Sequence, residues 1–461
     1  MRHEDTGAPR AVERWTSTPA FLFAAVGAAV GLGNLWRFPY VAGENGGGAF
    51  ILVYLLFVFL LGVPIMAAEM TIGRRGGSSA VGSVNRLIAE ERRPAFWKLI
   101  GGLSVLIPFV GLSYYSVVAA WVMDYVWLAL LDAFRGLDGA GSLAQFDALT
   151  SSVGRQVVLH FLFIAITVAI VCRGVNRGIE IAARVMMPGL FVLLLGLVVY
   201  NVFTMDFAGG VSFLFTPDFA RLTTDSILLA LGQAFFSVAI GVGVIMTYSA
   251  YLPRGISLPG SAGVICSLDA LVAILAGLAI FPIVFQFGLN PGEGPNLIFV
   301  TLPVAFGQMP GGWFIGVVFF TLVFFAAFTT AIGMLEPVVA FVRERVAMQR
   351  PGVTISAGLL AWLIGLPSLL SFNLLGTFFP LEWTGRFVGM TAFDVLDFII
   401  ANVLLPVNGL LIALFVGWGI SRVISVEELG LGEGYRYSTW LFIIRFVAPI
   451  AIAGLILDLW L

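Results

Sequence analysis

Asp269 is the most unusual side chain in this sequence, because several apolar residues stand on each side of it. A carboxylate in an apolar environment is energetically unfavourable unless it is paired or binds an ion. It could instead reach a polar interface, but the apolar residues around it disfavour that alternative. Thr329 and Thr330 are adjacent hydroxyl residues in another apolar run, and hard cations prefer oxygen ligands of this kind. Each hydroxyl could also donate to a carbonyl of its own helix. From their types alone, these residues are candidate cation ligands, and the alternatives stay open.

The elements that carry these residues are too apolar for a water-soluble protein. Hydrophobic residues make up 60% of the 461 residues and charged residues 11%, whereas soluble domains have roughly 25% charged residues. A membrane-spanning helix needs about 20 mostly apolar residues. We predict an all-α integral membrane protein, a single domain over 1–461, with about eleven spans near 19–41, 48–71, 97–130, 156–173, 179–203, 226–252, 261–286, 312–342, 353–371, 391–420 and 438–460.

Basic residues predict the orientation of these spans, since they collect in cytoplasmic connections. The connections expected to be cytoplasmic contain many: Arg74, Arg75, Arg86, Arg92, Arg93, Lys98, Arg173, Arg177, Arg343, Arg345 and Arg350. The connections 131–155 and 372–390 contain only Arg135, Arg155 and Arg386. We therefore expect a multi-pass protein of the cell membrane with a cytoplasmic N-terminus and, after an odd number of spans, with Leu461 outside.

Two of the predicted spans contain residues that interrupt helices. Residues 27–39 read GAAVGLGNLWRFP, and residues 233–243 read QAFFSVAIGVG. Backbone groups that leave a helix inside a bilayer must be satisfied by protein, water or a ligand. Close packing of small residues between helices would explain either segment alone. Two interrupted spans, five apart, favour an inverted repeat with a binding site at the membrane midplane.

Several other classes of protein are disfavoured by the composition. The net charge of −2 gives no basic field for nucleic acid. Cys172 and Cys266 lie in apolar runs, and His3 and His160 are far apart. We find no plausible acid, base, nucleophile or metal cluster, so we do not expect an enzyme.

Five segments of the sequence resemble the neurotransmitter:sodium symporter family. The first two are AVGLGNLWRFP at 29–39 and ENGGGAF at 44–50, and the other three are YY at 114–115, GQAFFS at 232–237 and FAAFTT at 325–330. The resemblance covers nearly the whole chain and is strongest to bacterial members that transport amino acids.

This resemblance implies a five-plus-five inverted repeat with broken helices 1 and 6. Repeat one would cover about 15–204 and repeat two about 224–420, followed by an extra helix at about 438–460.

The resemblance also implies two sodium sites. One would use three carbonyls and two hydroxyls, from Gly27, Val30, Ala326, Thr329 and Thr330. The other would use the Ala29 carbonyl, the Asn34 side chain, the carbonyl and hydroxyl of Ser237, and Asp269, where many relatives have asparagine.

Chloride is a third ion that some relatives require. In them it lies beside the second sodium, at positions that Tyr54, Gln233 and Ser237 match here. Their span-seven serine is Ala273 in this chain. Asp269 would supply the negative charge instead, so no chloride requirement is expected.

The implied substrate site has a polar and an apolar part. Gly31, where aminergic relatives have aspartate, leaves room for a substrate carboxylate to approach the helix-end N–H groups and the sodium at Asn34, and the Tyr115 hydroxyl would donate to that carboxylate. Ala29 and Ser237 are also predicted substrate-binding residues. The substrate side chain would be surrounded by Gly111, Phe236, Ala239, Val242, Thr330 and Met334. Gly111 and Val242 replace larger residues of a relative, which predicts a roomier pocket.

Two gates are implied as well. Arg37 and Asp397 match the family's outer pair. At the inner gate, Val12 stands where relatives have arginine, so Arg10 or Arg14 would pair with Glu344.

We therefore predict a sodium-coupled symporter that imports a neutral, bulky hydrophobic or aromatic L-amino acid by alternating access. Its partners would be this amino acid, sodium ions and the lipid bilayer, but not nucleic acid. The alternatives are a symporter for another zwitterionic solute and a membrane sensor that binds solute without moving it. A channel is disfavoured because broken helices fit an occluded site better than an open pore.

Overall fold

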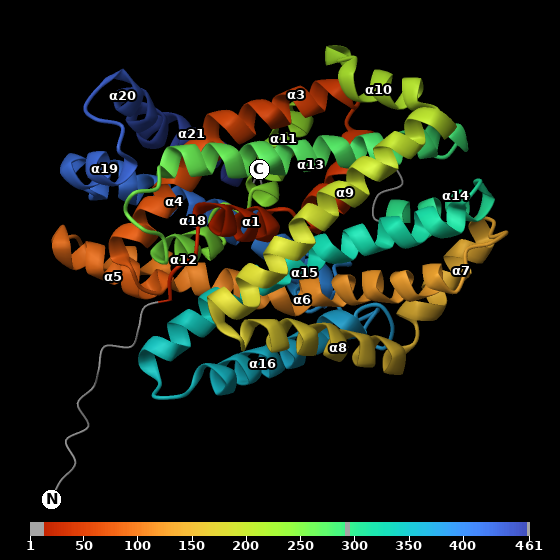
Figure 1. The fold of residues 1–461 in the computed structure, drawn as a ribbon, viewed down its shortest axis with the longest axis horizontal. Helices are drawn as coiled ribbons and strands as arrows, with labels where there is room; N and C mark the ends of the chain where they lie inside the picture. The colour runs from red at the N-terminus through yellow and green to blue at the C-terminus, as the bar shows by residue number, and fades with distance from the viewer. Residues whose placement is uncertain (1–12, 291–295, 459–461) are drawn as a thin grey trace, which may run out of the picture.

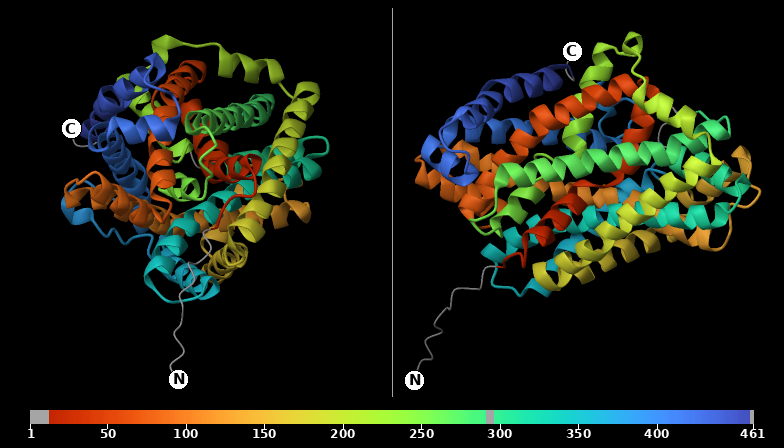
Figure 2. Two further views of the ribbon diagram at one scale, coloured as in Figure 1. Left: turned by 60° about the vertical axis from the view of Figure 1, so that its left-hand side comes forward. Right: turned by 45° about the horizontal axis from the view of Figure 1, so that its top comes forward.

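The structure is a bundle of long helices (Figures 1 and 2). The computed structural model describes residues 13–290 and 296–458, and every regular element in them is helical. Nine helices in this part of the chain are long and apolar enough to cross a membrane. They are formed by α3 (Gly48–Phe57) with α4 (Val63–Gly76), α6 (Lys98–Leu130), α8 (Val153–Val171), α9 (Glu180–Thr204), α13 (Leu258–Gln286), α15 (Gly312–Arg345), α16 (Arg350–Leu370), α17 (Ala392–Phe398) with α18 (Leu405–Leu414), and α20 (Tyr435–Phe442) with α21 (Ala448–Asp458). The all-α membrane prediction is confirmed.

Shorter helices mark the two ends of the bundle. One end carries α5 (Ala80–Glu90), α12 (Val244–Ala250) and α19 (Arg422–Leu429), and the other carries α7 (Gly139–Thr150), α10 (Phe207–Phe215) and α14 (Leu302–Gln308) (Figure 1). We refer to them as the α5 end and the α7 end.

The first predicted span is broken. It consists of α1 (Thr18–Ala29) and a second helical segment, Gly33–Glu44, which ends with α2 (Phe38–Glu44) and is bent by 52° relative to α1. Helix α1 stops because Val30 turns to an extended conformation, with ψ 101°. Gly33, beyond the break, lets the Phe236 ring lie close to the backbone, since a Cβ there would lie 2.9 Å from this ring and would displace it. The prediction of a broken first helix is confirmed.

The sixth predicted span is broken as well, into α11 (Thr224–Ser237) and α12. Between them Ala239, Gly241 and Gly243 all have positive φ, of 54°, 78° and 87°. A Cβ on Gly243 would lie 2.2 Å from the carbonyl oxygen of Ser104 on α6. Glycine is therefore required at 243 both for its backbone conformation and for the close approach of α6.

The polar groups released by this second break are satisfied by a buried carboxylate. Glu69 on α4 accepts hydrogen bonds from the N–H groups of Gly241 at 3.1 Å and Met246 at 3.2 Å. The Asn408 amide donates to the Gly241 carbonyl at 2.7 Å. Helices α4 and α12 also touch through their backbones, since a Cβ on Gly73 would lie 2.0 Å from the Met246 oxygen. Side chains from two other helices thus replace the missing helical hydrogen bonds.

The predicted count of eleven spans is not confirmed. The nine long helices and the bent pair of the described chain give at most ten by length and composition. The difference is the span predicted at 226–252. Helices α11 and α12 are each too short to cross a bilayer alone, and residues 238–243 separate them, whereas only residues 30–32 separate the two parts of the first span. The other ten predicted segments each coincide with a helix. The repeat boundaries 15–204 and 224–420 and the extra helix 438–460 remain predictions, and Leu461 lies outside the described residues.

The broken helices lie against long unbroken ones. Helix α6 packs on α15, and both contact α8 and α16. Helix α1 contacts α9, α13 and α15, and α12 contacts α1, α4 and α15. Both breaks are therefore held against α6 and α15 in the interior of the bundle.

Candidate ion and substrate site

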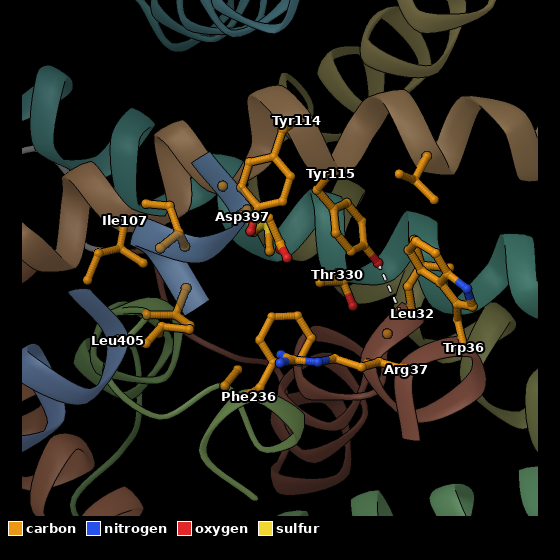
Figure 3. Close-up of a pocket in the computed structure, with 18 of the residues that line it drawn as sticks. Leu32, Trp36, Arg37, Ile107, Tyr114, Tyr115, Phe236, Thr330, Asp397 and Leu405 are labelled. Carbon is orange, nitrogen blue, oxygen red and sulfur yellow. Dashed lines mark hydrogen bonds between the residues drawn. The ribbon is translucent and has the colours of Figure 1, made fainter. Parts of the chain in front are cut away.

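A cavity of about 250 Å³ lies at the two helix breaks (Figure 3). Its lining comes from both broken segments, from α6 and α15, and from the span formed by α17 and α18. Nine of the ten predicted substrate residues line it: Ala29, Gly31, Gly111, Tyr115, Phe236, Ala239, Val242, Thr330 and Met334. Ser237 does not line the cavity. It lies in a polar network beside it.

Several apolar lining residues were missed by the sequence reasoning, among them Ile107, Val118, Val244 and Leu405. The first two could have been found. Ile107, Gly111, Tyr115 and Val118 recur at helical spacing on α6 and therefore share one face. Leu405 is on a different span, and its position depends on how that span packs.

Tyr115 and Gly31 form a polar part of the cavity. The Tyr115 hydroxyl accepts a hydrogen bond from the N–H of Leu32 at 3.4 Å, at the break of the first span (Figure 3). A Cβ on Gly31 would lie 2.7 Å from the Thr330 hydroxyl and 3.1 Å from the Tyr115 hydroxyl. The lack of a side chain at residue 31 therefore keeps this space open.

Oxygen atoms of the first predicted sodium site lie close together. The Thr330 hydroxyl donates to the carbonyls of Gly27 at 3.3 Å and Val30 at 3.2 Å. The Thr329 hydroxyl donates to Phe325 at 2.9 Å and to Ala326 at 3.1 Å, both on its own helix. Thr330 thus bridges α15 to the end of α1, whereas Thr329 bonds within α15.

Residues of the second predicted sodium site form a buried network around Asp269. The Asn34 amide nitrogen donates to Asp269 Oδ1 and to Ser237 Oγ, both at 2.9 Å. The Ser237 hydroxyl in turn donates to Asp269 Oδ2 and lies 2.9 Å from the Tyr54 hydroxyl. The Asn34 oxygen accepts from the N–H of Gly31 at 3.3 Å. All four polar side chains of this network are buried, and Ala29 lines the neighbouring cavity.

The two residues of the predicted outer gate share the cavity without forming an ion pair. The guanidinium carbon of Arg37 lies 4.7 Å from the ring centre of Phe236, within cation–π distance. Asp397 lies beside Tyr114 (Figure 3). Within 13–290 and 296–458 no nitrogen of Arg37 lies within 4 Å of an Asp397 oxygen.

At the α5 end, Glu344 has partners other than the predicted arginine. Its carboxylate accepts from the Ser78 hydroxyl and from the N–H and hydroxyl of Ser79. In the described part of the chain Arg14 forms no ion pair with Glu344, and Arg10 and Val12 lie outside that part. The inner-gate role of Glu344 remains a prediction.

A different ionic network occupies this end of the bundle. Arg350 forms ion pairs with Glu336 and with Glu13, and Arg343 pairs with Glu13 at 3.1 Å. The Tyr251 hydroxyl donates to Glu336 at 3.2 Å. The sequence reasoning missed this network, although a carboxylate at 336 in an apolar helix is the same kind of signal as Asp269.

Comparison with known proteins agrees with this architecture. The chain matches the profile described as "Sodium:neurotransmitter symporter family" over residues 12–135 and 144–459. It is 40% identical over 450 residues to the sodium-dependent transporter YhdH of Bacillus subtilis, covering 97% of each chain. It is 30% identical to a sodium-dependent transporter of Haemophilus influenzae, covering 95% of this chain and 96% of the relative.

A solved structure is similar over nearly the whole length. The crystal structure of MhsT in complex with L-phenylalanine matches with a TM-score of 0.88 and 39% identity, covering 97% of this chain and 99% of that one. Membership of a transporter family also agrees with the prediction that the chain is not an enzyme. The chain therefore belongs to the sodium:neurotransmitter symporter family and is a multi-pass, sodium-dependent membrane transporter.

Proposed function

We propose that the protein imports a neutral, bulky hydrophobic or aromatic L-amino acid together with sodium, by alternating access and without chloride. The observation that carries this proposal is a cavity with one polar part at Tyr115 and Gly31 and an apolar wall that has free space at Gly111. A zwitterion with a large apolar side chain matches both parts.

The polar part suits the charged end of an amino acid. The backbone leaves the helix at Gly31 and Leu32, where amide groups and the positive end of the following helix attract an anion. The Tyr115 hydroxyl can donate to a substrate carboxylate once it exchanges its contact with Leu32 N–H for the ligand. An aspartate at 31 would meet Thr330 and Tyr115, so the glycine favours a substrate with its own carboxylate.

The apolar wall suits a large side chain. A Cβ added to Gly111 would have Met334 as its nearest neighbour, at 3.9 Å, so this part of the cavity is not filled by the protein. Ile107, Val118 and Val242 complete an uncharged surface. A small side chain would leave voids and lose dispersion contacts. The similarity to MhsT, whose structure contains L-phenylalanine, supports the same class of substrate.

Two sodium ions would be bound by the oxygen atoms already described. At the first site, the Thr330 hydroxyl would turn its hydrogen away from the Gly27 and Val30 carbonyls. Its oxygen and these two carbonyls would then coordinate the sodium ion, with Ala326 and Thr329 completing the ligands. At the second, it would lie among Ala29, Asn34, Ser237 and Asp269. Sodium in transporters of this type is typically bound by carbonyls of unwound helices.

The position of Asp269 supports the proposed chloride independence. Its carboxylate is bonded to Ser237, which also contacts Tyr54, and these two residues match the chloride-binding positions of other family members. A fixed carboxylate there would balance the charge of the adjacent sodium and would repel a second anion.

The proposed orientation has the α5 end in the cytoplasm of the cell, with the N-terminus cytoplasmic and the C-terminus outside. The basic residues Arg74, Arg75, Arg86, Arg92 and Arg93 on and around α5 support it through the excess of positive charge expected in cytoplasmic connections.

A thermal-shift screen tests this proposal. The purified protein is heated with each of the twenty amino acids, in sodium and in potassium. We expect aromatic and branched neutral amino acids to stabilise the protein in sodium but not in potassium. Stabilisation mainly by basic, acidic or very small amino acids would contradict the substrate assignment. Counterflow of the best ligand in proteoliposomes then separates a carrier from a sensor, because only a carrier exchanges solute across the membrane.

A further inference from the structure

The structure carries a second candidate binding site on its outer surface, where three segments meet at the α5 end. The span Ala392–Gly419 ends in a π-helical turn (Phe415–Gly419). Two arginines from elsewhere in the chain donate to carbonyls of this turn. Arg93, in the connection between α5 and α6, donates through Nε to Gly419 at 2.6 Å, and Arg445, between α20 and α21, donates through Nε to Gly417 at 2.6 Å. Two guanidinium groups are thereby held on carbonyls only two residues apart.

These two positive charges are not neutralised by carboxylates. Within the described residues no acidic oxygen lies within 4 Å of a nitrogen of Arg93 or Arg445. Just beyond the turn, Glu91 accepts a hydrogen bond from the Ser421 hydroxyl at 2.7 Å. The helix end itself offers only about half a negative charge. Each guanidinium uses Nε here and retains four further N–H donors, an arrangement suited to a phosphate.

The position of the two arginines relative to the spans indicates which kind of phosphate compound would bind. Arg93 stands two residues before the span Ala95–Leu130 begins, and Gly419 is the last residue of its own span. Arg445 lies within the span Tyr435–Asp458 but reaches the same turn. The guanidinium groups therefore lie where hydrocarbon gives way to lipid headgroups.

Aromatic side chains surround this position and face outward. Trp418, between the two accepting glycines, is 52% exposed, and the guanidinium carbon of Arg445 lies 4.8 Å from its ring centre. Phe446 packs edge-on against Trp418, and Phe96 and Phe442 are also more than half exposed. Such aromatic residues are typical of the membrane interface. These aromatic side chains would contact the acyl chains next to the lipid headgroup. A soluble anion has no apolar part that could contact them.

We propose that Arg93, Arg445 and Trp418 form a binding site for the phosphate of an anionic phospholipid in the leaflet at the α5 end. Arg92, on the same connection, and Lys98, the first residue of α6, are exposed and add positive charge. The lipid would join the connection after α5, the turn after α18 and the turn between α20 and α21, at the end of the span that carries Asp397. The site is separate from the substrate cavity, so the proposal does not depend on the identity of the substrate.

Native mass spectrometry of the detergent-purified full chain tests this proposal. The probes are phosphatidylglycerol, phosphatidylcholine and inorganic phosphate. The variant is Arg93→Gln with Arg445→Gln, and the control is Arg254→Gln with Arg436→Gln, which removes two exposed charges from the same end of the bundle. We expect a specific phosphatidylglycerol adduct whose affinity falls about fivefold for each arginine removed, roughly 25-fold in total. The control should keep the wild-type affinity.

Three results would overturn the proposal. They are equal binding of phosphatidylcholine, equal loss of binding in the control, and displacement of the lipid by an equimolar amount of inorganic phosphate. If the double variant does not purify as a folded protein, Arg93→Gln alone is measured, since this side chain is exposed. An unchanged phosphatidylglycerol affinity in that single variant would equally exclude the site.

Discussion

The hydroxyl of Thr330 on α15 reaches the carbonyl oxygen of Val30 at the end of α1, 3.2 Å away and 300 residues distant in sequence. This contact joins a continuous helix to a broken one at the place where a cation site was predicted. Without an ion, a hydroxyl hydrogen lies between two carbonyls. With sodium bound, the same oxygen atoms would face the ion instead.

Removing a hydroxyl from this cluster should impair sodium-dependent uptake. Thr329→Val and Thr330→Val each keep the side-chain volume but remove one oxygen ligand from a desolvated cation, and unmet desolvation in such a site costs several kcal/mol. We expect at least a tenfold loss of uptake in proteoliposomes at fixed sodium. Thr354→Val is the matched control, since Thr354 is buried and bonds only to its own helix. Full activity of both variants, or equal uptake in potassium, would refute the sodium assignment.

Replacing chloride by gluconate should leave transport by the wild type unchanged, because Asp269 supplies the negative charge. The double change Asp269→Asn with Ala273→Ser should create a chloride requirement, since residues 269 and 273 lie one turn apart on the same face of α13. Uptake is measured at a series of chloride concentrations. A wild type that loses transport in gluconate would show that the carboxylate does not replace the anion.

Filling the apolar wall should change the ranking of substrates. Gly111→Val with Val242→Phe adds volume where the cavity is open at Gly111. Affinity for tryptophan and tyrosine should fall at least tenfold, while alanine is spared or improved. Competition against a labelled substrate measures this, with Val264→Phe, on the outward face of α13, as the volume control. An unchanged ranking would mean that residues 111 and 242 do not set the size limit.

Glu69→Gln should destabilise the protein. The carboxylate accepts from the N–H groups of Gly241 and Met246, whereas an amide would turn its own donor toward one of them. An unsatisfied buried donor costs about 1–3 kcal/mol, so the midpoint temperature of thermal unfolding should fall by several degrees. Thr71→Val on the same helix removes only a bond within α4 and serves as control. Equal transitions for the Gln variant and the wild type would show that the break is held by other contacts.

The sequence predicts the parts of the site that depend on local pattern. The break at Gly31 follows from the glycines and the proline around it, and Ile107 could have been added from the helical spacing of Tyr115. The buried carboxylates at 69 and 336 are also visible as charges within apolar runs. Their partners are not, because Gly241 is 172 residues from Glu69 along the chain, and only packing brings the two together.

The number of spans depends on how a break is treated. The residues around Gly241 and Gly243 predict an interruption within 226–252, and this segment folds as two short helices, α11 and α12. Neither helix alone is long enough to cross a bilayer, so the count of long helices and the bent pair does not include this predicted span.

The contact between α4 and α12 limits how the second break can move. Glu69 holds amide groups on both sides of the turn that precedes α12, and the backbones touch at Gly73 and Met246. The break is consequently not a free hinge on its α12 side. Any rearrangement that changes the angle of this segment must either swing α11 about a fixed α12 or carry α4 along as a rigid partner.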